Sequence, residues 1–391
     1  MQKYKLNNLI KIISQKSLLC IFIAVIFLSS CKSISTVDYQ NTQLVDKKVS
    51  TKVQNLHKRL FLISKKGFAI SQQDATSYGI GWKYSSDLKD IELKSDVYEI
   101  VNDYPGGFGF DLGGIEHGNT INLDTVPFND MRKLMVEAYK NGGLVTASWH
   151  LGNPVTGGSS WDTSGTNVIP QILKGGAFHE KYRTWVKRLA DFLKSVQYNN
   201  EPIPIIFRPF HEMNGSWFWW GGENVTAIDY IKLWRETVVM LRDEYNVHNL
   251  LYVYSPNKLE PQDDYMKYYP ADAYVDILGI DIYDFYNTED YVKAIKHDLK
   301  IVKEKAEERK KLYAFTETGL EKLNTENWFT EILYPNIKNT GIAWVLFWRN
   351  YTVNHFYMPY KTQLLENDLI KFSKYPETLF LKEVQQIKTK K

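Results

Sequence analysis

The strongest constraint on the fold is a regular alternation of short apolar runs with longer segments of helical periodicity. The eight apolar runs are residues 68–71, 107–111, 143–149, 203–210, 250–254, 275–283, 312–317 and 342–348. Several are almost continuously apolar, as expected for strands of a parallel sheet that is covered on both faces. Between them, segments such as 182–196 and 230–245 repeat large apolar residues at helical spacing. Eight strand–helix units in series predict an α/β fold, a single (β/α)8 TIM barrel.

Both ends of the chain are expected to lie outside the barrel. Residues 1–30 combine four lysines, no acid and an apolar run, which is the pattern of a signal peptide. The run ends in Leu-Ser-Ser-Cys31, which resembles the lipobox of bacterial lipoproteins, in which this cysteine is lipidated. An ordinary signal peptide or a single anchor helix are the alternatives. Residues 31–55 are polar and predict a flexible tether, 56–380 form the predicted barrel domain, and 381–391 a polar tail.

Charge and cysteine content exclude several classes of protein. Without residues 1–30 the formal net charge falls from +3 to −1, because four lysines are removed with this leader. The basicity of the full chain therefore implies no affinity for nucleic acid. Cys20 is also removed, and the single remaining Cys31 allows neither an internal disulfide nor a cysteine-based metal site. The eight histidines show no metal-ligand spacing. These residues therefore do not indicate a metal site, although a structural metal stays possible. The reaction expected below requires no cofactor.

Two glutamates at the ends of predicted strands carry the functional prediction. Glu212 follows the run 203–210 and precedes a cluster of tryptophans, while Glu317 ends the run 312–317. The carboxyl ends of barrel strands meet at one face, where active sites are built. An acid among indole rings can protonate a leaving oxygen while sugar rings stack on the indoles. Retaining glycosidases need a second carboxylate about 5 Å away. The alternative is a structural ion pair of Glu212 with Arg208, with the tryptophans in the core.

Further polar and aromatic residues fall at or just after the same strand ends. They are Asp111, His150, Arg208, His211, Asp281, Tyr283, Trp348 and Arg349. Each could be a satisfied structural group when taken alone. Their gathering at one predicted rim favours a functional site.

A series of ordered blocks carries a family resemblance. The blocks are Gln73-Asp74, Tyr78-Gly79, Asp103-Tyr-Pro, Gly109-Phe-Asp-Leu-Gly-Gly-Ile-Glu116, Ser148-Trp-His150, Pro154-Val-Thr-Gly-Gly, Trp161-Asp162, Arg208 to Gly221, Tyr254-Ser-Pro256, Asp276 to Tyr283, Thr316-Glu-Thr-Gly319, Trp348-Arg-Asn350 and His355-Phe-Tyr. Over most of residues 65–360 the chain thus resembles glycoside hydrolase family 26, the β-mannanase family.

The resemblance implies a role for each matching position. Glu212 matches the general acid/base and Glu317 the nucleophile. His211 matches a residue that tunes the acid and contacts substrate, and Tyr283 matches a tyrosine that hydrogen-bonds the nucleophile. Substrate contacts are implied for His150, Trp217 and Trp348 around the cleaved sugar, for Asp281 and Arg349 one sugar further toward the non-reducing end, and for Trp161. A structural pair between Arg349 and Asp281 is an alternative that is compatible with binding.

These implications define the function that we expect. The enzyme would be a mannan endo-1,4-β-mannosidase, or one that releases mannobiose, and would act with retention on mannan, galactomannan or glucomannan. A related β-glycanase acting on xylan or mixed-linkage glucan is one alternative, and a non-catalytic glycan-binding lipoprotein is another. We expect a monomer whose partners are the mannan chain and a membrane. The lipid would hold it in a bacterial cell envelope, at the outer membrane, on its periplasmic or surface face.

Overall fold

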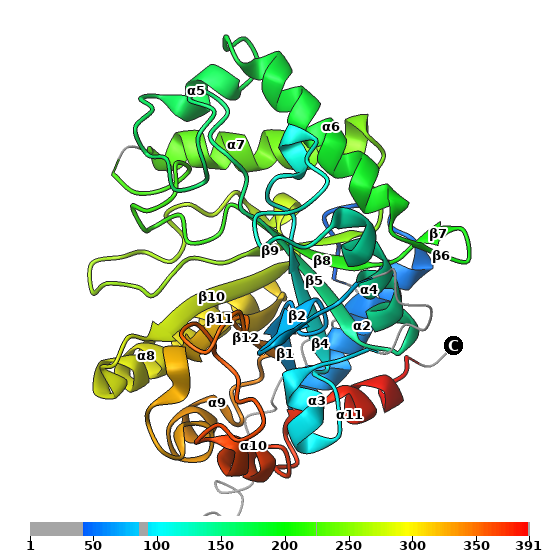
Figure 1. Ribbon diagram of the computed structural model, residues 1–391. Coiled ribbons are helices and arrows are strands. Elements are labelled where there is room, and N and C mark those ends of the chain that lie inside the picture. Colours follow the sequence, from blue (N-terminus) through cyan, green and yellow to red (C-terminus); the bar gives the residue numbers. More distant parts are fainter. Residues whose placement is uncertain (1–41, 86–92, 224, 390–391) are drawn as a thin grey trace, which may run out of the picture. The chain divides into compact units, whose positions relative to one another are not determined.

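The eight predicted strands form a closed parallel barrel (Figure 1). The protein is described by a computed structural model that covers residues 42–85, 93–223 and 225–389. The barrel strands are β1 (Phe68–Gln73), β4 (Gly107–Asp111), β5 (Leu144–Trp149), β8 (Ile205–Pro209), β9 (Leu250–Tyr254), β10 (Ile277–Asp284), β11 (Leu312–Leu320) and β12 (Trp344–Phe347). Neighbours in this order pair in parallel, and Ala69 of β1 lies opposite Trp344 of β12, which closes the sheet. The predicted (β/α)8 fold is confirmed.

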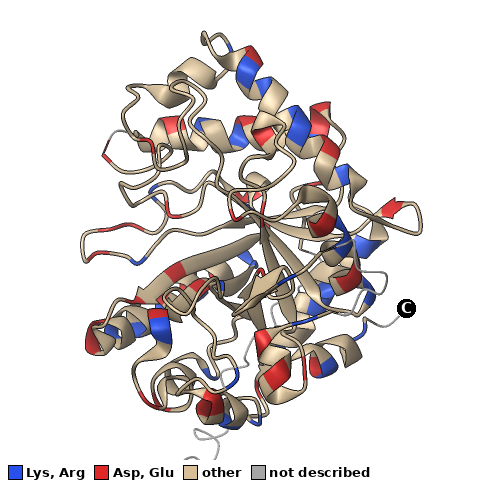
Figure 2. Cartoon of the chain, in the orientation of Figure 1, with Lys and Arg blue, Asp and Glu red and all other residues tan. Residues whose placement is uncertain are grey.

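Helices surround the barrel, and they carry many more acidic and basic residues than the strands do (Figure 2). The helices are α2 (Thr51–Lys66), α3 (Asp96–Val101), α4 (Phe128–Lys140), α5 (Val168–Ile172), α6 (His179–Ser195), α7 (Ala227–Val239), α8 (Thr288–Arg309), α9 (Tyr334–Ile337), α10 (Glu366–Phe372) and α11 (Leu381–Gln386). The predicted segments 182–196 and 230–245 correspond to α6 and to α7 with its continuation Met240–Glu244. Thr226 is the N-cap of α7, because its hydroxyl oxygen accepts a hydrogen bond from the Asp229 amide at 3.1 Å. The short strands are β2 (Tyr78–Gly79), β3 (Trp82–Lys83), β6 (Gln197–Tyr198), β7 (Glu201–Pro202) and β13 (Thr378–Leu379).

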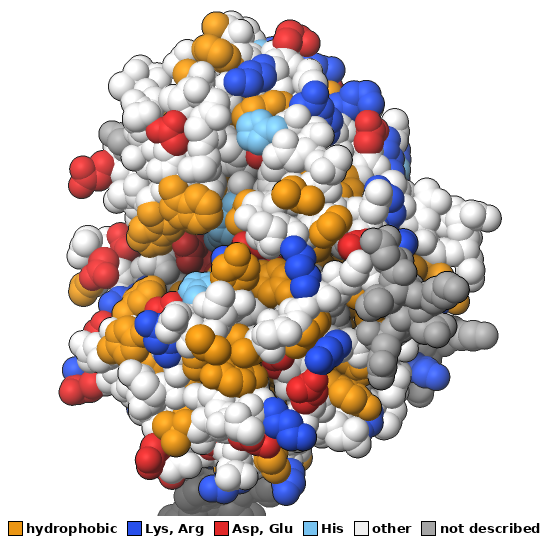
Figure 3. Space-filling view, in the orientation of Figure 1, with side chains coloured by type: hydrophobic (Ala, Val, Ile, Leu, Met, Phe, Trp, Pro, Cys, Tyr) orange, Lys and Arg blue, Asp and Glu red, His pale blue; other side chains and the backbone are white. Residues whose placement is uncertain are grey.

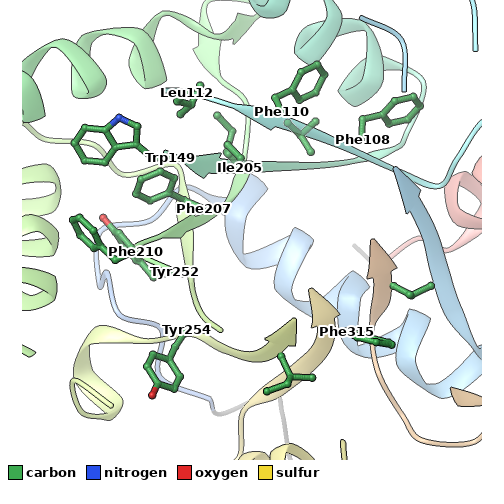
Figure 4. Packing of buried hydrophobic residues seen from close by; sticks show 14 of the residues in the cluster. Phe108, Phe110, Leu112, Trp149, Ile205, Phe207, Phe210, Tyr252, Tyr254 and Phe315 are labelled. Atoms are coloured by element: carbon green, nitrogen blue, oxygen red, sulfur yellow. The ribbon is translucent and has the colours of Figure 1, made fainter. Parts of the chain in front are cut away.

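Successive strand residues point alternately outward and inward. On β8 and β9, Phe207 and Tyr252 pack in the large cluster between the strands and the surrounding helices (Figure 4). Their sequence neighbours Ile206, Leu251 and Val253 point the other way and belong to a second cluster, which fills the barrel interior. Because strand side chains alternate with a period of two, apolar runs of this kind supply both layers at once.

Helix α2 closes the base of the barrel and corrects the predicted N-terminal boundary. Its residues Val53, Leu56, Leu60 and Ile63 are buried and belong to the interior cluster. The predicted tether 31–55 therefore ends too late, since the fold already includes residues 42–55. Their polar composition suggested a linker, but the apolar residues recur at helical spacing, and burial of that single stripe is enough to hold the helix. The predicted signal peptide, Cys31 and residues 31–41 lie outside the described residues.

The predicted polar tail 381–391 also contains part of the fold. Helix α11 begins at Leu381, whose amide donates to the Tyr104 carbonyl at 2.9 Å, and Val384 is fully buried. Two apolar residues were enough to dock a segment that is otherwise polar and rich in lysine. Within the described part of the chain, none of the helices is both long and apolar enough to cross a bilayer.

Candidate active site

Inward-facing strand positions change from apolar to charged toward the carboxyl ends. On β8, Ile206 is followed two positions later by Arg208, which lines the barrel interior with it. Between β10 and β11 the register shifts after Ile280, so that Asp281 pairs with Glu317. Phe315 packs outward against the helices. Because side chains on a regular strand alternate with a period of two, Glu317 would also point outward if the bulge were absent. A bulge re-aims the side chains that follow it. This one brings Glu317 beside Asp281.

The second glutamate reaches the same place by a strained turn. Beyond the end of β8, Phe210 and Glu212 both have positive φ, 48° and 55°. Such values are uncommon for residues other than glycine and concentrate at functional sites. The Glu212 amide donates to the Ser255 carbonyl at 2.8 Å, which fixes the turn against the end of β9. The turn directs the Glu212 side chain toward the centre of the rim.

The carboxylates converge closely. Oxygens of Glu212, Asp281 and Glu317 lie within 4.8 Å of one another. Retaining glycosidases hold their two carboxyl groups about 5–5.5 Å apart, whereas inverting enzymes leave about 6.5–9.5 Å for a water. Carboxylates at this spacing could also hold a cation, but the Arg208 guanidinium already pairs with Asp281 at 2.8 Å and with Glu317. The alternative pairing of Arg208 with Glu212 alone is therefore wrong, because the guanidinium bonds the other two acids.

The two glutamates have unlike environments. Burial raises the pKa of Glu212 well above its ordinary value, and the nearby charges of Glu317 and Asp281 raise it further. Two groups oppose this shift: the indole N–H of Trp217, which donates to Glu212 at 2.8 Å, and the positive charge of Arg208. Glu317 instead accepts the Tyr283 hydroxyl at 2.7 Å and an N–H of Arg208. Donors of this kind favour a charged carboxylate. Glu212 is therefore suited to carry a proton, whereas Glu317 is held in place by two hydrogen-bond donors.

Two histidines at the rim have pKa values that are shifted in opposite directions. His150 lies 2.6 Å from the Asp111 carboxylate. Burial disfavours a charged His150, but the Asp111 carboxylate outweighs this and raises the pKa of the imidazole. For His211, burial lowers the pKa well below its ordinary value, and the positive charges of Arg208 and His150 lower it further. The two rings meet edge to face at 4.5 Å. The surroundings therefore favour the charged form at His150 and the neutral form at His211.

Exposed aromatic rings flank the carboxylates. Trp161 is 52% exposed and lies parallel to His150 at 5.5 Å, and Trp217 is 39% exposed. Trp348 is half-buried and lies 6.2 Å from His150. In the space-filling view, acidic side chains and a histidine are visible in a hollow that is bordered by hydrophobic side chains (Figure 3). Flat apolar faces around acids suit sugar rings, whose axial C–H groups stack on indoles.

The other tryptophans of the predicted cluster are structural. Trp219 is 3% exposed and Trp220 fully buried, and their indole N–H groups donate to main-chain carbonyls. Gly215 allows the Trp217 ring to pack against its backbone, because a Cβ at position 215 would lie 2.2 Å from the indole ring. The alternative interpretation, that the tryptophans belong to the core, is thus correct for Trp219 and Trp220 and wrong for Trp217.

Arg349 lies in a separate polar network that the sequence did not predict. Its guanidinium pairs with Asp124 at 3.1 Å and contacts the Tyr78 hydroxyl at 3.2 Å, and that hydroxyl donates to Asp74 at 2.8 Å. The alternative pair of Arg349 with Asp281 is therefore wrong. Asp124 lies in a loop far from any predicted strand end, so no periodic signal could have identified it. Tyr78 and Asp74 stood only in the resemblance blocks.

Asp281 does not fit the sugar contact that the resemblance implied. It is fully buried and bonds Arg208 and the Ser255 hydroxyl, the latter at 3.1 Å. Burial and the charge of Glu317 raise its pKa to about 7, although Arg208 opposes the rise. We therefore interpret Asp281 as a positioning residue beneath the two glutamates.

A (β/α)8 barrel with two close carboxylates in unlike hydrogen-bonding surroundings, set among aromatic rings, has the arrangement of a glycoside hydrolase. Comparison with known proteins gives the family. The sequence profile of glycosyl hydrolase family 26 matches residues 45–331, and the chain belongs to this family.

The relatives with solved structures cover nearly the whole described chain. A glycoside hydrolase family 26 β-mannanase from Bacteroides ovatus is 38% identical, with a TM-score of 0.81, over 86% of this chain and 97% of that one. The chain of a modular endo-β-1,4-mannanase from Cellulomonas fimi is 30% identical, with a TM-score of 0.79, over 88% of this chain and 78% of that one.

One relative is considerably longer. The mannan endo-1,4-β-mannosidase of Bifidobacterium adolescentis is 34% identical over 304 residues, which are 75% of this chain but only 29% of that protein. The similarity therefore concerns the barrel, and the chain spans less than a third of that relative's length.

Proposed function

We propose that this protein hydrolyses β-1,4-mannosidic bonds in mannans with retention of anomeric configuration. The observation that carries the proposal is the pair of carboxyl groups whose oxygens lie within 4.8 Å of each other in opposite environments. The mannanase names of the family 26 relatives favour mannan as the substrate. No cofactor takes part in this reaction.

The first half of the reaction uses both glutamates at once. Glu317 attacks the anomeric carbon, and a bond forms between its carboxylate oxygen and that carbon while the bond to the leaving oxygen breaks. Glu212 gives its proton to the leaving oxygen. Tyr283 and Arg208 hold Glu317 in place for the attack. Burial and the neighbouring carboxylates favour the protonated form of Glu212, and the indole N–H of Trp217 holds its carboxyl group in place.

The second half reverses these roles. Glu212, now a carboxylate, takes a proton from a water whose oxygen attacks the anomeric carbon. The ester bond to Glu317 breaks, and Glu317 leaves as a carboxylate. Two inversions at one carbon give net retention.

The roles are tested by two variants and an aryl mannobioside with an acidic phenol. Glu212→Ala should form the glycosyl-enzyme from this substrate, because its leaving group needs no acid, and then accumulate it for want of a base. Azide should restore turnover and give the β-azide. Glu317→Ala should give at most the inverted α-azide. A Glu212→Ala variant that is equally slow on mannan and on the aryl glycoside, without azide rescue, would show that the acid/base is another residue.

The substrate is tested by product profiles on mannan, mannohexaose, xylan and lichenan. Mannan should be cleaved and xylan and lichenan left intact. Early formation of a ladder of oligosaccharides would indicate endo attack, whereas mannobiose alone would indicate release from a chain end. Cleavage of xylan or lichenan in preference to mannan would refute the substrate assignment.

We also propose that Cys31 carries a lipid and holds the enzyme to a bacterial envelope membrane. The sequence Leu-Ser-Ser-Cys31 after an apolar run supports this. Palmitate labelling should disappear in Cys31→Ser, and the enzyme should then leave the membrane fraction. Labelling that survives the substitution would contradict the proposal.

A further inference from the structure

The first described segment of the chain carries a concentrated positive charge. Residues 42–66 contain seven lysines or arginines and one acid, a formal charge of +6. Residues 1–41 contribute +4 to the full-length +3, so residues 67–391 carry a formal charge of −7. The protein is therefore polarised between one short basic segment and an acidic remainder.

The basic segment lies at the end of the barrel opposite the carboxylates. The Thr42 hydroxyl donates to the Lys310 carbonyl at 3.3 Å, and the Val45 amide donates to Asp276 at 2.8 Å. Lys310 and Asp276 stand just before β11 and β10, at the amino ends of these strands. The two glutamates stand at the carboxyl ends. The chain thus enters the fold at the base of the barrel, away from the cleft.

Helix α2 presents its outward face at this base. Lys58, Leu62 and Lys65 follow one another at positions i, i+4 and i+7, with Lys66 adjacent, and the helix contains no acidic residue. Leu62 is 39% exposed and the three lysines are exposed. Within residues 42–85, 93–223 and 225–389, none of these three lysines pairs with a carboxylate. Lysines on one exposed face are attracted to an anionic membrane surface, and an exposed leucine among them adds an apolar contact at the headgroups.

A hollow beside α2 adds further cations. It has a volume of about 270 Å³, and its lining contains no carboxylate. The lining includes Lys52 and Arg59 of α2, Lys388 near the C-terminus, and the apolar Leu56 and Ile387. Lys52 also reaches Glu201 at 2.6 Å on the rim of this region. Cations above apolar side chains match a phosphate headgroup joined to its hydrocarbon.

We propose that this basal patch, defined as Lys58, Leu62, Lys65 and Lys66, docks on an anionic phospholipid surface and turns the catalytic cleft away from the membrane. The location rests on the proposed lipid at Cys31. Ten residues separate Cys31 from Thr42, and a chain of that length reaches at most about 36 Å. The tether is attached at the base, so the base lies within reach of the headgroups. The acidic remainder, which contains the cleft, is repelled by the same surface.

The test uses the chain from Lys32 onward, which lacks the lipid but keeps every described residue. Sedimentation should show binding to vesicles of phosphatidylglycerol and phosphatidylcholine, and no binding to phosphatidylcholine alone. Binding should weaken as salt rises. The triple variant Lys58→Gln/Lys65→Gln/Lys66→Gln should lower the partition coefficient on the order of 100-fold, since each lysine at an anionic surface contributes about 5-fold.

A matched control removes the same charge elsewhere. Lys133, Lys174 and Lys361 are exposed and form no ion pair within the described ranges, and changing all three to glutamine should alter binding less than about 5-fold. Equal losses in the two triple variants, or binding that ignores phosphatidylglycerol, would overturn the proposal.

Activity separates this inference from the proposed catalytic function. Hydrolysis of a soluble mannan oligosaccharide should be the same in both triple variants and the parent. Vesicle binding needs no catalysis, so an inactive enzyme that still binds would refute only the catalytic proposal. If Cys31 carries no lipid but the chain still binds vesicles, only the proposed lipid anchor is refuted.

Discussion

Replacing Arg208 with methionine should destabilise the protein by an amount that grows with pH. The guanidinium is buried, 6% exposed, and pairs with Asp281 at 2.8 Å and with Glu317. Removing one partner of a buried ion pair costs about 3–5 kcal/mol. Two unpaired carboxylates less than 4.8 Å apart also repel each other by about 3.5 kcal/mol at an effective dielectric constant near 20.

The pH dependence follows from Asp281. Its pKa in the parent protein is about 7, and loss of the Arg208 charge raises it further. Between the unfolded and the folded pKa, the carboxyl group is protonated in the folded protein but ionised in the unfolded chain. The free energy of unfolding therefore falls as pH rises through this range. In the folded parent, Asp281 loses its proton near pH 7, whereas in the folded variant it loses its proton at a higher pH. The additional loss therefore develops above that pH and reaches about 2 kcal/mol by pH 8.5, at up to about 1.4 kcal/mol per pH unit.

Thermal unfolding measures this loss. An entropy of unfolding of about 2.1 cal/mol/K per residue, over roughly 350 residues, converts 3 kcal/mol into about 4 °C and 5 kcal/mol into about 7 °C. The melting temperature of Arg208→Met should therefore fall by about 4 °C at pH 5 and about 7 °C at pH 8.5. Asp281→Asn in the same background should recover much of the loss at pH 8.5. Arg132→Met, at a partly exposed position, controls for the substitution type. An equal shift at both pH values, or no recovery by Asp281→Asn, would refute the reasoning.

Two further substitutions test the tuning of the acid and of the rim. Trp217→Phe keeps an aromatic face but removes the donor that opposes protonation of Glu212. The pKa of Glu212 should rise, moving the basic limb of the pH profile of kcat/KM to higher pH, with kcat/KM about 10-fold lower at the optimum. An unmoved basic limb would contradict this. Asp111→Asn removes the charge that raises the pKa of His150. A raised histidine pKa stabilises folding below its unfolded value of 6.5 and not above the folded value, so the melting temperature should fall more at pH 5 than at pH 8.5. A greater fall at pH 8.5 would show that His150 is neutral.

The barrel and the two glutamates could be predicted from the sequence because both depend on local patterns. Continuous apolar runs between helical segments identify parallel strands, and a strand end identifies the rim. Glu212 and Glu317 stand at such ends, so their meeting follows from the topology even though they are 105 residues apart. The polar composition of residues 42–55 and 381–391 predicts linkers, because it conceals the few apolar residues that dock these segments. Val53, Leu56, Leu60 and Ile63 form an apolar stripe inside a polar stretch.

Only the tertiary structure decided how these residues are partnered. The bulge after Ile280 turns Glu317 inward, and nothing in a single strand's pattern predicts which residue a neighbouring strand skips. The sequence could not predict the partners of Arg208 either, because Glu212, Asp281 and Glu317 all stand at the same rim and only the fold shows that Arg208 pairs with the last two. Asp124 reaches Arg349 from a loop of no regular period. Sequence periodicity determined which residues reach the rim, because periodicity follows from backbone geometry. Ion pairs and hydrogen bonds act over a few ångströms between distant segments, so they are settled only when the fold has placed those segments side by side.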